Sequence, residues 1–109
     1  MTTAEANRAA RKVYTYFGGA AAYRDAPVVL PATTYGVDAY VVSWEGGPDE
    51  WVAELDGTDS ESTRVMMNDA AREFGVPYVA TRRAPIEFAA GIAYEPYSSF
   101  AVILYKETL

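Results

Sequence analysis

The sequence contains no cysteine and no histidine among its 109 residues. Without cysteine the chain has neither a disulfide framework nor a thiolate nucleophile. Without histidine it lacks the commonest general base, and the two absences together remove the usual zinc ligands. Catalysis would depend on carboxylates, lysine, tyrosine, serine or threonine, and no residue stands out as catalytic. The sequence favours a non-enzymatic protein and indicates neither a cofactor nor a bound metal.

Long hydrophobic runs are also missing. The longest uncharged apolar runs, at 88–94 and 100–105, are far shorter than the ~20 residues of a membrane span. The basic residues near the N-terminus are not followed by a continuous apolar stretch, so no signal peptide is expected. We therefore expect a cytoplasmic protein with no membrane partner.

Positive charge is scarce and unevenly placed. The net charge is −6, yet residues 1–30 sum to +2. Residues 31–62 hold eight acids and no lysine or arginine, and residues 63–109 balance. A protein that binds nucleic acid directly is usually basic, so nucleic acid is not an expected partner. The acidic middle segment suits a protein that avoids phosphate backbones or imitates them.

Two segments carry helix signals. The first, 3–17, opens on a capping-box pattern at 2–5 and has apolar residues at helical spacing. The second, 59–74, opens on a similar pattern at 58–61 and is followed by Gly75, a residue typical of helix ends. Both segments are predicted to bury one apolar stripe each.

The remaining apolar runs predict strands. Their β-branched and aromatic residues place strands at 28–30, 37–44, 51–55, 78–82, 86–94 and 99–105, with turns at 46–50 and 95–98. The order is then α-β-β-β-α-β-β-β. It predicts a single α+β domain over 1–109, with a mostly antiparallel sheet of five to six strands and two helices on one face.

The stretch SWEGGPDEW (43–51) contains both tryptophans and three acids. In one interpretation, Trp44 and Trp51 face each other across a hairpin and anchor it. In the other, one tryptophan faces solvent and contacts a partner. The strand 37–44 is apolar on both faces, with Tyr40 and Trp44 on the same one. An uncovered apolar sheet face usually belongs to an interface.

These features favour a small acidic protein-binding module that acts through protein–protein contact. It would self-associate as a homodimer if the +2 segment of one copy met the −8 segment of another. Two alternatives are an inhibitor that imitates nucleic-acid phosphates, which would suit a viral origin, and an enzyme or ligand carrier based on carboxylates and tyrosines. The candidate partner-binding residues are Trp44, Trp51, Tyr40, Asp49, Glu50, Asp56, Asp59 and Glu61.

Overall fold

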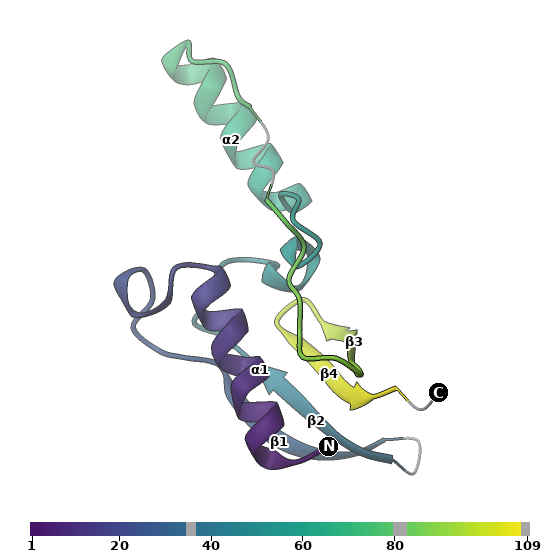
Figure 1. The fold of residues 1–109 in the computed structure, drawn as a ribbon. Helices are drawn as coiled ribbons and strands as arrows, with labels where there is room; N and C mark the ends of the chain where they lie inside the picture. The colour runs from purple at the N-terminus through teal and green to yellow at the C-terminus, as the bar shows by residue number, and fades with distance from the viewer. Residues whose placement is uncertain (35–36, 80–82, 108–109) are drawn as a thin grey trace.

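The computed structural model describes residues 1–34, 37–79 and 83–107. In chain order, its elements are α1 (Thr3–Tyr16), the 3₁₀ turn η1 (Gly19–Ala21), β1 (Val28–Thr34), β2 (Val37–Ser43), the 3₁₀ turn η2 (Trp51–Glu54), α2 (Glu61–Phe74), β3 (Ile92–Ser98) and β4 (Ala101–Lys106). The strands form one antiparallel sheet in the order β1-β2-β4-β3 (Figure 1). The α+β class and the antiparallel sheet are confirmed. The sheet has four strands in the described part of the chain, so the predicted five to six strands and their order are wrong.

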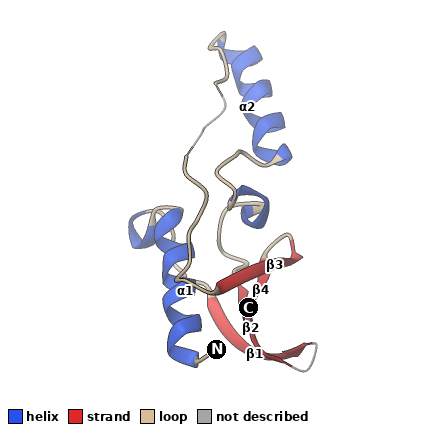
Figure 2. Cartoon of the chain, turned by 45° about the vertical axis from the view of Figure 1, so that its right-hand side comes forward, coloured by secondary structure: helices blue, strands red, loops and turns tan. Residues whose placement is uncertain are grey.

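Helix α1 covers one face of the sheet. The predicted capping box is present, since the Glu5 N–H donates to Thr2 Oγ1 and the Thr2 N–H donates to Glu5 Oε1. The helix ends one residue before the predicted Phe17. Figures 1 and 2 show α1 lying across the sheet. The residues that it buries are mostly small, which allows close approach to the strands: Ala6, Ala9, Ala10 and Val13.

The predicted strand 51–55 is instead a 3₁₀ turn that fills the core beside α1. Trp51 and Leu55 are fully buried there, in one cluster with Val42 and Val102 of the sheet. β2 ends at Ser43, and the turn begins after Glu50, whose φ of 52° is in the left-handed region. Large apolar side chains at 51–55 thus stabilise the core without adding a strand.

The two tryptophans are neighbours in this core, although not as a cross-strand pair. Their ring centres lie 6.0 Å apart, and Trp51 Nε1 donates to the Trp44 carbonyl oxygen over 2.9 Å. Gly47 passes so close to Trp44 that a Cβ at position 47 would lie 2.6 Å from its indole ring. The stretch 43–51 therefore folds over its own first tryptophan rather than forming a hairpin.

The last two strands begin and end at other residues than predicted. Residues 86–91 are not strand, and the predicted turn 95–98 lies inside β3. β3 is an edge strand, where the missing N–H of Pro96 removes no bond from the sheet interior. The register shifts between Pro96 and Ser98, and the chain turns at 99–100.

Helix α2 does not lie on the sheet, so the prediction of two helices on one face is wrong. Figures 1 and 2 show it projecting from the body beyond the end of α1. The core cluster beside α1 is formed with η2 and the two tryptophans, and it includes no residue of α2. The radius of gyration is 15.5 Å, against about 13 Å for a compact domain of this length. The long dimension of 52 Å reflects the projecting helix.

Candidate protein-binding surface

Helix α2 exposes its apolar residues. None of its 14 residues is buried. Met66 is 62% exposed and Phe74 is 74% exposed, and the side chains of Val65 and Met67 are also open to solvent. Apolar residues exposed together on one element mark interaction surfaces more often than scattered single ones do. This helix is the main candidate for a partner-binding element.

Local signals define both ends of α2. Ser60 is the N-cap, and its Oγ accepts from the Thr63 N–H over 3.2 Å. The helix therefore begins two residues later than predicted, because the hydroxyl of Thr58 donates to Asp56 instead. Gly75 ends it with φ of 67°, as predicted from the sequence. Such caps favour the helix, but a helix of this length is marginal in water without tertiary contacts.

The start of α2 is fixed to the core by Glu54. This buried carboxylate accepts from the Ser60 N–H over 3.3 Å and from Thr63 Oγ1 over 3.0 Å. It also lies 3.9 Å from the guanidinium of Arg83. A buried charge is tolerated when it is paired and hydrogen-bonded, as here. Glu54 therefore sets the direction in which α2 leaves the body.

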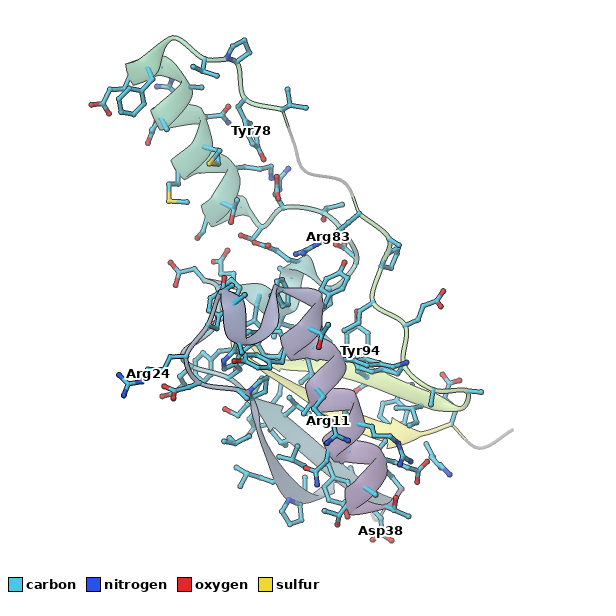
Figure 3. The ribbon with its side chains drawn as sticks, turned by 60° about the vertical axis from the view of Figure 1, so that its left-hand side comes forward. Arg11, Arg24, Asp38, Tyr78, Arg83 and Tyr94 are labelled. Carbon is cyan, nitrogen blue, oxygen red and sulfur yellow. The ribbon has the colours of Figure 1, made fainter. Side chains whose placement is uncertain are left out.

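Arg83 holds the segment through which the chain returns from α2 to the body. Its guanidinium donates to the Tyr16 carbonyl oxygen over 2.9 Å and lies over the rings of Tyr16 and Phe17. Figure 3 shows Arg83 at the junction between α1 and the projecting segment. The backbone N–H of Arg83 donates to the Gly57 carbonyl oxygen over 3.2 Å. A Cβ on Gly57 would lie 2.0 Å from the Arg83 carbonyl oxygen, so only glycine fits at this junction.

The chain returns along α2 after Gly75. The Tyr78 hydroxyl donates to the Asp59 carboxylate, which ties the returning segment to the start of the helix. This hydrogen bond, followed by burial, raises the pKa of Tyr78 above its usual value. Figure 3 shows Tyr78 directed from the return segment toward α2. We call α2 together with the return segment 75–79 the arm.

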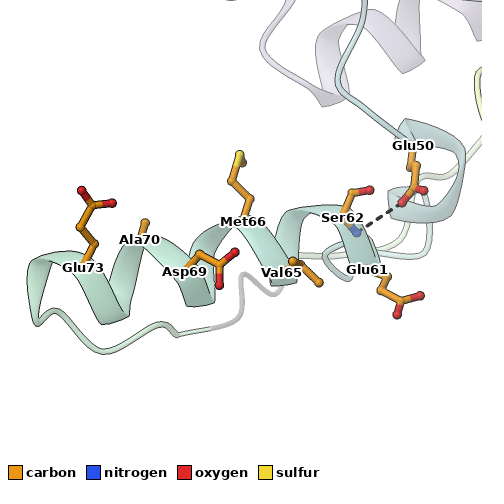
Figure 4. Close-up of a pocket in the computed structure, with 8 residues that line it drawn as sticks. All are labelled: Glu50, Glu61, Ser62, Val65, Met66, Asp69, Ala70 and Glu73. Atoms are coloured by element: carbon orange, nitrogen blue, oxygen red, sulfur yellow. Dashed lines mark hydrogen bonds between the residues drawn. The ribbon is translucent and has the colours of Figure 1, made fainter.

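An open groove of about 740 Å³ runs along α2 (Figure 4). Its apolar lining comes from Val65, Met66 and Ala70, and none of its lining residues is a lysine or arginine. The Glu50 carboxylate accepts from the Ser62 N–H over 3.4 Å and closes the end nearest the body. The acids along it are Glu50, Glu61, Asp69 and Glu73. We call this the acidic groove.

A second groove of about 790 Å³ lies between α1 and the segment 84–87. Lys12 Nζ donates to the Glu87 carbonyl oxygen and the Tyr16 hydroxyl donates to the Ala84 carbonyl oxygen, which hold the segment beside α1. Its charged lining is mainly basic and its apolar lining includes Pro85 and Ile86. The cations are Arg8, Arg11 and Lys12. We call this the basic groove.

The sheet face opposite α1 is a third surface. No described helix covers it in Figures 1 and 2. The strand register places Leu30, Val41 and Ile103 side by side on it. Leu30 is 53% exposed, whereas Ile103 is buried. Tyr40 and Trp44 belong to the other face, which is covered.

Of the aromatic candidates, the two tryptophans lie away from solvent and Tyr40 is partly buried. Trp44 is 2% exposed and Trp51 is 0% exposed, and each indole N–H donates to a backbone carbonyl oxygen. The Tyr40 hydroxyl is hydrogen-bonded to Thr3 Oγ1 over 2.9 Å at the start of α1. In this arrangement the tryptophans stabilise the core and offer a partner no surface.

The acidic candidates separate into two groups. Asp56 accepts hydrogen bonds from the hydroxyl and the backbone N–H of Thr58. Both lower the pKa of Asp56, and the bond from the hydroxyl has the larger effect. Asp59 holds Tyr78, and Asp49 is exposed outside the groove lining. Of the predicted acids, Glu50 and Glu61 line the acidic groove. The predicted segment thus supplies only part of the surface.

Sequence reasoning missed the larger part of the acidic groove. Asp69 and Glu73 lie outside the acidic segment 31–62 because they follow it on the same helix. Val65 lies off the stripe formed by Met67, Ala70, Ala71 and Phe74, whereas Met66 lies one turn before Ala70 at the edge of that stripe. Apolar residues on two sides of one helix were the available signal, because a helix that packs on one sheet face needs only one stripe.

No group of three or more acidic side chains in the described part of the chain is placed to hold a metal ion. None of the described helices is long and apolar enough to cross a membrane. No family model matches the chain, and no curated protein or solved structure is significantly similar to it.

Proposed function

We propose that this chain is a small, acidic, non-enzymatic protein-binding module, and that the arm is its recognition element. One observation carries the proposal: α2 has no buried residue and exposes Val65, Met66 and Phe74, yet its base is fixed to the core. An element that served stability alone would bury its apolar side chains. An element that is held rigidly at its base and left bare along its length is suited to contact another protein.

The energetics favour a partner on this surface. Each square ångström of apolar surface removed from water contributes roughly 25 cal/mol. An amphipathic helix that meets an apolar groove is a common form of recognition, with anchors spaced three and four residues apart. Met66 and Ala70 have that spacing, and the flanking acids would favour a partner with basic residues around an apolar centre.

A phosphate-imitating inhibitor is the weaker alternative. Its acids should present a continuous charged surface, whereas Asp56 and Asp59 are engaged in local hydrogen bonds at the base of the arm. The remaining acids flank apolar side chains. Purely electrostatic binding falls steeply with salt, while binding through Met66 and Val65 would keep an apolar component.

Retention of proteins from an extract of the natural host tests the proposal. The immobilised full chain is compared with Val65→Ser/Met66→Ser in the acidic groove and with a matched control, Val28→Ser/Leu30→Ser, on the exposed part of β1. We expect the groove variant to lose the retained proteins and the control to keep them. Equal retention by all three chains would show that the arm is not the recognition element.

A further inference from the structure

We propose that the partner of the arm is a second copy of this chain. The acidic groove of one copy would receive the basic face of α1 of the other, and the same contact would form a second time around a two-fold axis. This inference depends on the proposed function, because it names the partner of the same surface. It commits to the basic groove as the surface that the arm meets.

Charge complementarity is the first argument. The acidic groove carries four carboxylates and its lining includes no lysine or arginine. The basic groove carries three cations and one acid, Glu87. Within α2, Arg72 lies 3.7 Å from Asp69 and offsets part of the groove's charge, which leaves the other three carboxylates in excess. Two grooves of the same charge would repel each other, whereas these two attract.

Shape and polarity are the second argument. Each groove has an apolar centre: Val65 and Met66 on α2, and Pro85 and Ile86 beside α1. Their volumes, about 740 and 790 Å³, are similar. Helices α1 and α2 have 14 residues each, so both are about 21 Å long. An apolar centre within a charged rim is the usual composition of a protein interface.

Symmetry is the third argument. Both grooves belong to the same chain, so an isologous dimer uses each contact twice. The reciprocal arrangement brings the interface toward the roughly 800 Å² per partner that stable complexes bury. The elongated form of the molecule, 52 Å by 30 Å by 21 Å, allows two copies to lie side by side in opposite directions. Each arm then lies along the body of the other copy.

Charge exchange between two variants tests this pairing. Variant A is Arg8→Glu/Arg11→Glu in the basic groove, and variant B is Asp69→Lys/Glu73→Lys in the acidic groove. All four residues are exposed, and circular dichroism would check that each variant is folded. In variant A alone, both contacts set two acidic grooves against each other, and in variant B alone the acidic groove keeps no net charge, so both contacts lose their attraction. In a one-to-one mixture of A and B, one contact keeps the two wild-type grooves, and in the other the lysines introduced in B face the glutamates introduced in A.

Sedimentation velocity of the full chain at ~100 μM and low salt is the measurement. We expect the wild type to dimerise, A and B to associate at least about tenfold more weakly, and their mixture to recover the dimer. The Val28→Ser/Leu30→Ser control should dimerise like the wild type. Recovery in the mixture separates lost complementarity from damage to the fold.

Three results would overturn the inference. A mixture of A and B that stays monomeric would exclude the proposed pairing. A dimer lost only in the β1 control would place the interface on the open sheet face. A wild type that is monomeric at low salt would exclude a second copy. In that case, groove-dependent retention from the host extract would keep the proposed function and assign the arm to a different, basic protein.

Discussion

The guanidinium carbon of Arg83 lies 4.2 Å from the centre of the Tyr16 ring. Through this contact the end of α1 is joined to the segment that leaves the arm. The same guanidinium lies 3.9 Å from Glu54, which in turn accepts from the N-cap of α2. Arg83 therefore contacts both the end of α1 and the carboxylate that holds the start of α2.

Replacing Arg83 with alanine should loosen the arm. The variant loses the cation–π contacts and leaves Glu54 without its cationic neighbour, at a combined cost of about 1–3 kcal/mol. Limited proteolysis within residues 61–79 should become faster while the sheet stays protected. The control is Arg72→Ala, whose ion pair with Asp69 is exposed and contributes little. Equal cleavage rates in the two variants would refute the role of Arg83.

Gly57 and Gly75 give a matched pair for the junction. Both have positive φ, 94° and 67°, but only at Gly57 would a Cβ collide with backbone, 2.0 Å from the Arg83 carbonyl oxygen. We expect Gly57→Ala to lower the free energy of unfolding by about 2–4 kcal/mol, from strain and forced backbone movement. Gly75→Ala should cost about 1 kcal/mol, because its surroundings are open. Urea titration of both variants measures the difference, and similar midpoints would contradict the close approach at Gly57.

The tryptophans should behave as buried residues. Their exposed fractions are 2% and 0%, and Trp51 lies in contact with Trp44. We expect blue-shifted emission and weak quenching by acrylamide in the isolated protein, with no change when a partner binds. Trp51→Phe should destabilise the fold by about 2–4 kcal/mol, through lost volume and a lost hydrogen bond. Strong quenching would return the tryptophans to the set of partner-binding residues.

Glu5 should give the fold an acid-sensitive component. The hydrogen bond from the Thr2 N–H, and then the Lys106 ammonium 3.1 Å away, lower the pKa of Glu5 from 4.5 to about 2. Because the folded-state value is the lower one, this contribution is present above about pH 4.5 and is lost as the pH falls toward 2. Thermal unfolding between these values should show a smaller pH dependence for Glu5→Gln than for the wild type. The exposed Glu45→Gln serves as the control, and an unchanged dependence in Glu5→Gln would contradict the assignment.

Local signals predicted the elements that local interactions decide. The capping box at Thr2 and Glu5 and the end at Gly75 depend on residues near in sequence. The strand predicted at 37–44, which is Val37–Ser43 in the structure, could be recognised from its own β-branched and aromatic residues. The segment 51–55 was mistaken for a strand because its alternation of apolar residues also suits a turn that buries Trp51 and Leu55. Tertiary packing decided between the two.

The candidate site was harder to predict from the sequence. An apolar stripe on a helix normally predicts burial, and nothing local shows that η2 already occupies the available core. The acidic segment contains Glu50 and Glu61, but the groove combines them with Asp69 and Glu73 from two later turns of α2. A strand was predicted at 78–82. Its first two residues, 78–79, are not strand in the structure and belong to the segment that returns beside α2, and residues 80–82 lie outside the described part of the chain.

Hydrogen exchange of the wild-type chain at low and high protein concentration would show whether α2 and α1 meet between two copies. At low concentration the amides of α2 should exchange faster than those of α1, because α2 has no buried residue. At high concentration we expect new protection in 61–73 and in 8–16 together, with no change in β1. The proposed dimer would be wrong if new protection appeared in β1 alone. It would also be wrong if α2 gained no protection at any concentration.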